Sequence, residues 1–203
     1  MLSIGGPYSD WTNVYSSDAN RQSFLTTALS AVRTYALDGV NIDIEGSYFA
    51  TPRQVANLII DLRKTLNTIG RKYITLTSDC IAIYQGVAVP DPDVGGNPFN
   101  YMVPIIQLAD TSIDYYQTKA YSNWYDGYDH TSLDYLQDVY LNWRNLQGYC
   151  KGCKPIANFK GVATNKLLLG VVGSPDARKT PEYAGPQIIR DFKAWLMSKG
   201  YDM

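Results

Sequence analysis

Polar side chains alternate with apolar ones at the end of the segment Gly39–Glu45, where Asn41, Asp43 and Glu45 are separated by single Ile residues. Because a β-strand points successive side chains to opposite faces, these three polar residues share one face. Two carboxylates so close push their proton affinities apart, so that one can stay protonated near neutral pH while the other ionises. The pattern therefore indicates general acid–base chemistry by Asp43 and Glu45. The alternative is a carboxylate cluster held by backbone amides or by a bound cation.

The place of Glu45, at the carboxyl end of its predicted strand, indicates where this chemistry would occur. Parallel strands covered by helices are usually apolar on both faces, and burying two carboxylates without partners is costly. Ligands of such sheets bind beyond the carboxyl ends of the strands. We therefore expect Asp43 and Glu45 to lie where the strand opens into a cleft.

Strand and helix patterns alternate along the rest of the chain. Apolar residues at helical spacing predict helices, short apolar runs predict strands, and Thr51-Pro52 is typical of a capped helix start. The segment 7–17 is predicted to be a polar, aromatic loop. The predicted strands are 1–4, 39–44, 73–78, 113–121 and 166–172, and the predicted helices are 18–36, 52–70, 101–109, 132–147 and 185–199.

Strands separated by helices of this length imply parallel pairing through right-handed crossovers, so the predicted class is α/β. A closed eight-stranded barrel typically takes about 250 residues. Five strands in 203 residues therefore predict a small open sheet or part of a barrel. The absence of a linker in the sequence favours a single domain over residues 1–203.

The amino-acid composition limits the classes of molecule that this protein could bind. Lys plus Arg total 18 and Asp plus Glu total 19, a net charge of -1 that lacks the basic excess with which proteins bind nucleic acid or anionic membranes. No apolar run reaches the roughly 18 residues of a membrane-spanning helix. Seventeen Tyr and four Trp supply aromatic rings with a polar atom, which suit surfaces that bind sugars. We expect no nucleic acid and no membrane as partners.

The segment Asp38–Glu45 resembles the DxxDxDxE signature of family 18 glycoside hydrolases, the chitinases and their relatives. Ser3-Ile4-Gly5-Gly6 resembles the SxGG motif of the preceding barrel strand, and later strands of the family are similar to segments 75–79, 101–106, 115–124 and 166–177. The resemblance implies a (β/α)8 TIM barrel in which residue 1 begins at the third strand and residues 201–203 stop before the eighth. The chain would then hold an incomplete barrel of about five parallel strands with flanking helices.

The resemblance also implies an activity, the hydrolysis of β-1,4-linked N-acetylglucosamine polymers by a retaining, substrate-assisted mechanism without cofactor or metal. Glu45 would protonate the glycosidic oxygen and later activate water. Asp43 would orient the acetamido group of the substrate, and Tyr121 would hydrogen-bond its oxygen. Chitin or chitooligosaccharide is the expected partner, and secretion is expected because that polymer is extracellular.

The expected substrate-binding residues are Asn41, Asp79, Lys119, Asn123 and Trp124. Asn41 stands where the family usually has an aspartate, which predicts a shifted pH profile. Lys119 replaces a usually neutral residue. Near Glu45 its ammonium would favour the ionised carboxylate and weaken the general acid. The alternative is that Lys119 forms a structural bridge to Asp43. Asp79 matches a substrate-contacting acid, although a helix cap or turn residue fits as well.

Aromatic residues of the predicted strand-to-helix loops could stack on sugar rings or could serve loop packing. These residues are Trp11, Tyr48, Tyr84, Trp124 and Tyr125. We expect His130 to be solvated at a helix start, and Trp143 and Trp195 to belong to the core. The spacing of Cys150 and Cys153 favours a local disulfide over free thiols or a metal site. We expect Cys80 to be buried.

Two other functions remain open at this point. A chitin-binding lectin on the same scaffold is favoured by Lys119, by Asn41 and by the missing strands. The other is a fragment of a longer gene product that has no function of its own. The sequence does not indicate endo or exo action, chain-length preference or oligomeric state.

Overall fold

Five parallel strands form one sheet in the computed structural model, in the spatial order β1-β2-β3-β4-β5. The structure describes residues 1–7, 9–45, 50–121, 129–147, 153–174, 176 and 183–201. Each strand pairs with the next one along the chain, as in a sheet wound by right-handed crossovers. The strands are β1 (Leu2–Gly5), β2 (Gly39–Ile44), β3 (Tyr73–Asp79), β4 (Tyr115–Lys119) and β5 (Leu167–Gly170).

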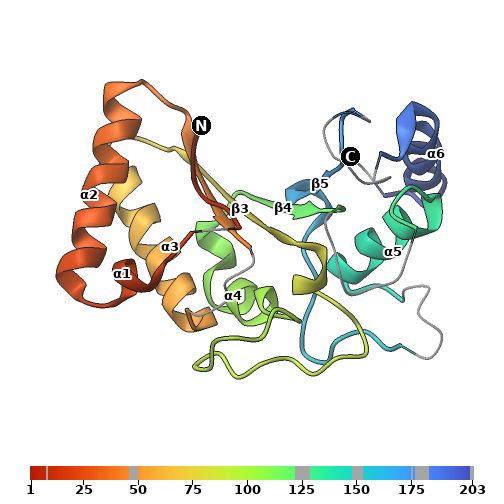
Figure 1. Cartoon of the computed structure of the whole chain (residues 1–203), viewed down its shortest axis with the longest axis horizontal. Helices are drawn as coiled ribbons and strands as arrows, with labels where there is room; N and C mark the ends of the chain where they lie inside the picture. Colours follow the sequence, from red (N-terminus) through yellow and green to blue (C-terminus); the bar gives the residue numbers. More distant parts are fainter. Residues whose placement is uncertain are drawn as a thin grey trace.

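The predicted α/β class and the five strands are confirmed. Within the described residues the sheet is open, with β1 and β5 at its two edges, and does not close into a barrel. In Figure 1 the larger helices follow one another around the outside of the sheet, from α2 on the left to α6 on the right. The helices are α1 (Thr12–Tyr15), α2 (Asp18–Thr34), α3 (Pro52–Asn67), α4 (Met102–Ala109), α5 (Leu133–Trp143) and α6 (Gly185–Ser198).

Local signals in the sequence set the helix starts. Thr51 caps α3: its side chain accepts a hydrogen bond from the Gln54 amide, and the Gln54 side chain accepts one from the Thr51 amide. Ser17 caps α2 and Ser132 caps α5 in the same way, each with its side-chain oxygen. These capped starts agree with the predicted boundaries.

The segment 7–17 is not the plain loop that the sequence predicts, because it contains the short helix α1. Trp11, just before α1, is only 8% exposed. Its ring centroid lies 6.0 Å from that of Phe24 on α2 and 6.5 Å from that of Tyr15. Burial of these rings docks one helical turn onto α2, a tertiary effect that the local polar pattern does not reveal.

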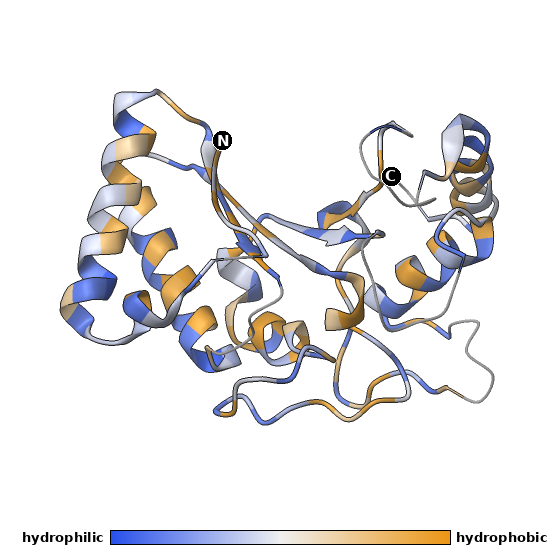
Figure 2. Ribbon diagram, viewed as in Figure 1, coloured by the Kyte–Doolittle hydropathy of each residue, from blue (hydrophilic) through white to orange (hydrophobic). Residues whose placement is uncertain are grey.

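The core lies between the sheet and the helices. Val40 and Ile42 are fully buried, and α3 contributes a stripe of buried residues that consists of Val55, Leu58, Ile59, Leu62 and Leu66. Figure 2 shows apolar and hydrophilic residues alternating along α2, α3 and α5, as in helices that bury one side only. Trp143 on α5 is 0% exposed and its indole N–H donates to the carbonyl oxygen of Cys80 at 2.9 Å, which confirms its core position.

An ion-pair cluster ties together the amino-terminal ends of β3 and β4. Asp114, just before β4, accepts hydrogen bonds from the amide of Ile74 at 2.8 Å, from Arg71 at 2.7 Å and from Arg63. Its side chain is 8% exposed and that of Arg63 is 13% exposed. Burial opposes the ionisation of Asp114, but these hydrogen bonds outweigh burial and lower its pKa. The cluster is at the end of the sheet opposite Glu45.

Candidate active site

Three charged side chains meet where β2, β3 and β4 end. Glu45 directly follows β2, while Asp79 and Lys119 are the last residues of β3 and β4 and are register partners. The ammonium of Lys119 lies 2.9 Å from Oδ1 of Asp79 and also contacts Oε2 of Glu45. The side chains are 6% exposed for Lys119, 12% for Glu45 and 15% for Asp79. The carboxyl edge of the sheet thus holds a buried Glu-Lys-Asp cluster.

The position of Lys119 resolves one alternative left by the sequence. Its ammonium contacts Glu45, as the first reading expects, and its second carboxylate partner is Asp79. An ammonium in contact with a carboxylate stabilises the ionised form of that carboxylate. The contact with Lys119 therefore favours the ionised form of Glu45.

Asp79 takes the position before the short 3-10 helix Cys80–Ala82, but its side chain makes no capping hydrogen bond there. Asp79 thus takes a helix-cap position without the side-chain hydrogen bond of a cap. Its carboxylate instead faces the ammonium of Lys119 on the neighbouring strand.

Asp43 lies two residues before Glu45 on the same face of β2, between Gly5 on β1 and Thr77 on β3. Its Oδ1 is buried and has no hydrogen-bond partner among the described residues. Burial raises the pKa of Asp43, and the charge of Lys119 opposes that rise. Asp43 therefore retains a proton more readily than an exposed aspartate does.

The close approach of β1 depends on glycine. Gly5 has a φ of +125°, and a Cβ at this position would overlap the carbonyl oxygen of Asp43. The amide of Gly6 donates to that same oxygen at 3.0 Å. The two glycines of the SxGG segment thereby fix the backbone that carries Asp43.

Asn41 links three strands through its side-chain amide. Its Nδ2 donates to the hydroxyl of Ser3 at 3.0 Å, and its Oδ1 accepts from the hydroxyl of Thr77 at 2.8 Å. The amide is thus oriented by β1 and β3, on the same strand face as Asp43. It provides a neutral neighbour for that carboxyl group.

Tyr121 follows β4 on the same side of the strand as Lys119. The ammonium of Lys119 lies 5.8 Å from the centroid of the Tyr121 ring. A Cβ on Gly170 of β5 would lie 3.6 Å from Cε1 of Tyr121 and 3.4 Å from Nε2 of Gln117. Gln117 and Tyr121 thus both lie next to Gly170 on the neighbouring strand.

The other residues singled out from sequence divide into two groups. Trp11 is buried against Phe24, and the ring centroid of Tyr84 lies 6.2 Å from that of Phe99 in an edge-on contact. These contacts agree with loop packing for Trp11 and Tyr84. The second group lies outside the described residues and consists of Asn123, Trp124, Tyr48, Tyr125 and Cys150.

His130 is not the solvated residue that the sequence predicts. It is half-buried, and its ring stacks on Tyr135 with centroids 4.5 Å apart. The hydroxyl of Tyr135 lies 3.5 Å from Sγ of Cys80, the residue after Asp79. Sequence reasoning missed this stack because its partner is one turn into α5, among residues that read as core.

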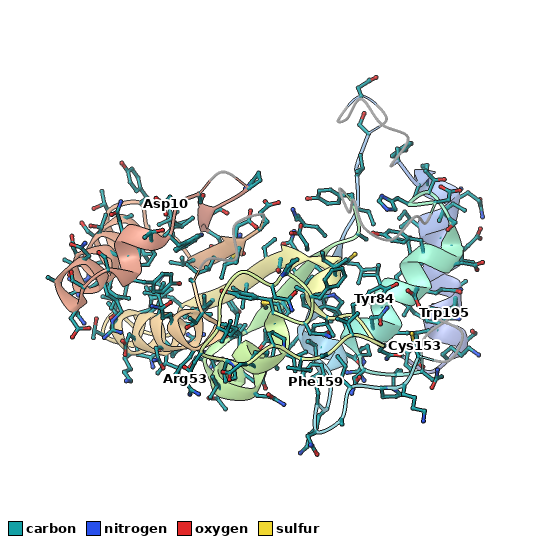
Figure 3. All side chains as sticks on the ribbon, turned by 60° about the horizontal axis from the view of Figure 1, so that its bottom comes forward. Asp10, Arg53, Tyr84, Cys153, Phe159 and Trp195 are labelled. Atoms are coloured by element: carbon teal, nitrogen blue, oxygen red, sulfur yellow. The ribbon has the colours of Figure 1, made fainter. Side chains whose placement is uncertain are left out.

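The cysteines agree in part with expectation. Cys80 is buried and belongs to no disulfide, and Cys153 is disulfide-bonded. Cys153, labelled in Figure 3, lies against Gly86, where a Cβ would come within 2.8 Å of its sulfur. Trp195, also labelled in Figure 3, is half-buried on α6 and packs edge-on against Tyr140 with ring centroids 5.9 Å apart.

The described part of the chain holds no candidate for two other kinds of site. No three or more His, Cys, Asp or Glu side chains there are grouped so that they could hold a metal ion. None of the helices there is long and apolar enough to cross a membrane.

Solved structures share this fold. A family GH18 chitinase from Chromobacterium violaceum is 20% identical over 88% of this chain and 48% of its own length, with a TM-score of 0.62. A GH18 chitinase from Pseudoalteromonas aurantia is 17% identical over 96% of this chain and 65% of its own, with a TM-score of 0.65. The Legionella pneumophila ChiA C-terminal domain is 16% identical over 84% and 57%, with a TM-score of 0.59.

This chain thus spans less than two thirds of the length of these structures. The likeness confirms that its five strands and flanking helices have the arrangement of a TIM-barrel-type fold. The family model for glycosyl hydrolases family 18 matches residues 1–175, which include every strand of the sheet and the Glu-Lys-Asp cluster. The chain belongs to the family 18 glycosyl hydrolases.

Proposed function

We propose that this chain cleaves β-1,4-linked N-acetylglucosamine polymers, with Glu45 as the general acid and base. The observation that carries the proposal is the placement of Asp43 and Glu45 on one face of β2, with Glu45 directly beyond its carboxyl end. Both residues lie inside the family match. The structures that share this fold include proteins described as chitinases, which supports chitin or its oligosaccharides as the substrate.

The proposed reaction needs no nucleophile from the protein. The carboxyl group of Glu45 gives its proton to the glycosidic oxygen while the bond from that oxygen to the anomeric carbon breaks. The 2-acetamido oxygen of the substrate attacks the same carbon from the other side. Water then displaces the acetamido oxygen from the anomeric carbon and gives a proton to Glu45, which restores the acid, the free acetamido group and the original anomeric configuration.

Two further residues act on the acetamido group in this proposal. Asp43 orients the group and stabilises the positive charge that develops on it, from a buried position two residues before Glu45. The hydroxyl of Tyr121 hydrogen-bonds the acetamido oxygen. Because the substrate polymer is extracellular, the proposal places this activity outside the cell.

A second candidate function is a chitin-binding lectin on the same scaffold. The observation that favours it is the contact between Lys119 and Glu45, because a carboxylate paired with an ammonium is a poor proton donor. The lectin would bind the same sugars and would leave their glycosidic bonds intact.

Glu45→Gln tests the proposal and separates it from the lectin. We expect this variant to bind chitooligosaccharide, measured by calorimetry, and to lose hydrolysis, measured by chromatography of the products. Asp18→Asn is the matched control, because the carboxylate of Asp18 is 92% exposed on α2. Glu45→Gln that cleaves at the wild-type rate would refute the proposal. Binding without cleavage by the wild type would establish the lectin instead.

A further inference from the structure

The Glu-Lys-Asp cluster places one ammonium between carboxylates from two strands. Lys119 at the end of β4 contacts Glu45 beyond β2 and lies 2.9 Å from Asp79 at the end of β3. None of the three side chains is more than 15% exposed, so water screens their charges only weakly. The charge of Lys119 therefore acts strongly on both carboxylates.

The charged and titratable groups around Glu45 come from all three strands. Among the residues that the structure describes, they are Asp43 on β2, Asp79 on β3, and Lys119 and Tyr121 at the end of β4. Lys119 is the cation of this set and faces three carboxyl groups. Asp79 and Glu45 share the ammonium of Lys119. Loss of the Lys119 charge therefore raises the proton affinity of Glu45, and loss of the Asp79 charge lowers it.

We propose that Lys119 is a positioning residue that holds Glu45 as a fixed, ionised carboxylate and thereby confines hydrolysis to acidic solution. This inference rests on the proposed role of Glu45 as proton donor. While the ammonium contact is intact, the donor form of Glu45 is populated only when the solution is acidic enough to protonate it. Asp79 moderates the effect, because its own negative charge offsets part of the ammonium charge.

Three variants give distinct expectations for the pH dependence of kcat/KM, which reports the groups of the free enzyme. Lys119→Met removes the ammonium and should move the alkaline limb of the kcat/KM profile to higher pH, by about one to three pH units. Asp79→Asn removes the moderating carboxylate and should move that limb downward. Lys119→Arg keeps the charge and should retain the wild-type limb.

A carboxyl titration tests the same inference without turnover. Glu45 and Glu182 are the two glutamates of the sequence, so NMR with side-chain 13C-labelled glutamate gives two signals, of which Glu45→Gln removes one. We expect the midpoint of the Glu45 signal to rise in Lys119→Met and to fall in Asp79→Asn. Circular dichroism and the urea midpoint show whether each variant is folded.

The outcomes separate this inference from the proposed function. Opposite shifts of the Glu45 signal support the role of Lys119, because general damage to the site would not move the two variants in opposite directions. Unchanged midpoints, or shifts in the same direction, would overturn it. If neither the wild type nor Lys119→Met cleaves chitooligosaccharide, the proposed function fails, while the titration still decides whether Lys119 controls Glu45.

Discussion

Asp79 and Lys119 are register partners at the ends of β3 and β4, and their side chains form an ion pair of 2.9 Å. This pair fixes the ammonium beside Glu45, so the charge at the carboxyl edge of the sheet depends on three strands together. The charge beside Glu45 and the strand register are therefore linked in this protein.

Asp43→Asn should lower activity and raise stability. Removing the carboxyl group that we propose to orient the acetamido group should reduce kcat by about a hundredfold to a thousandfold. Because burial raises the pKa of Asp43 above 3.8, its ionisation costs stability as the pH rises through that pKa. The variant should therefore gain free energy of unfolding at neutral pH, measured by urea titration. The gain should disappear in acid below the unfolded pKa, and a gain that persisted there would contradict this account.

Asn41→Leu should destabilise the sheet by about 1 to 3 kcal/mol, because it leaves the hydroxyls of Ser3 and Thr77 without their partner. Asn41→Asp is the matched variant, since both hydroxyls can donate to a carboxylate. Urea unfolding should show the loss in the first variant and a smaller loss in the second. In Asn41→Asp the added negative charge should also raise the pKa of Asp43, which an NMR titration can measure. Equal destabilisation by both variants would disprove the linking role of the amide.

Asp114→Asn should cost about 3 kcal/mol at neutral pH, because it leaves the buried guanidinium of Arg63 without its carboxylate. Since hydrogen bonds hold the pKa of Asp114 low despite its burial, its contribution is present above the unfolded value near 3.8. That contribution is lost as the pH falls through the folded value. The difference from wild type in urea titrations should therefore shrink in strong acid.

Arg71→Ala is the control for Asp114→Asn. Arg71 binds the same carboxylate, but its side chain is 81% exposed. The expected loss is at most about 1 kcal/mol. If Arg71→Ala lowered the free energy of unfolding as much as Asp114→Asn does, the solvent exposure of Arg71 would not explain the expected difference between the two variants.

Gly5→Ala should disrupt both the fold and the site, because the new Cβ overlaps the carbonyl oxygen of Asp43. Gly6→Ala is the matched control: its φ of +113° carries a similar backbone strain, and a Cβ there meets no atom of the described residues within 4 Å. Thermal unfolding should show a clearly lower midpoint for Gly5→Ala than for Gly6→Ala. Similar midpoints would mean that strain alone, and not the approach of β1 to Asp43, determines the effect.

Local patterns predicted the elements that depend on local physics. β2 spans Gly39–Ile44, the predicted range, because its alternation of polar and apolar residues has the period of a strand. The start of α3 was predicted from Thr51-Pro52, and the capping box at Thr51 confirms it. β4 is shorter than the predicted 113–121, because Asp110–Ser112 forms a 3-10 turn before it and its pairing with β5 ends at Gly170.

The partners across the sheet could not be predicted in the same way. The sequence placed Asp43 and Glu45 on one strand face, and period two alone is enough for that. The ion pair of Lys119 with Asp79 depends on the register of β4 against β3, which no local pattern specifies. The signal that could have revealed it is the presence of opposite charges at the ends of two neighbouring predicted strands.

The two ends of β4 serve different purposes. The residue before it, Asp114, fastens the strand to its neighbours by charge and hydrogen bonds, and the last residue, Lys119, sets the charge beside Glu45. Four residues separate them, so they stand at opposite rims of the sheet. The chain can therefore exchange its reactive groups at one rim while the anchor at the other keeps it folded, which makes this scaffold suited to the redesign of its chemistry.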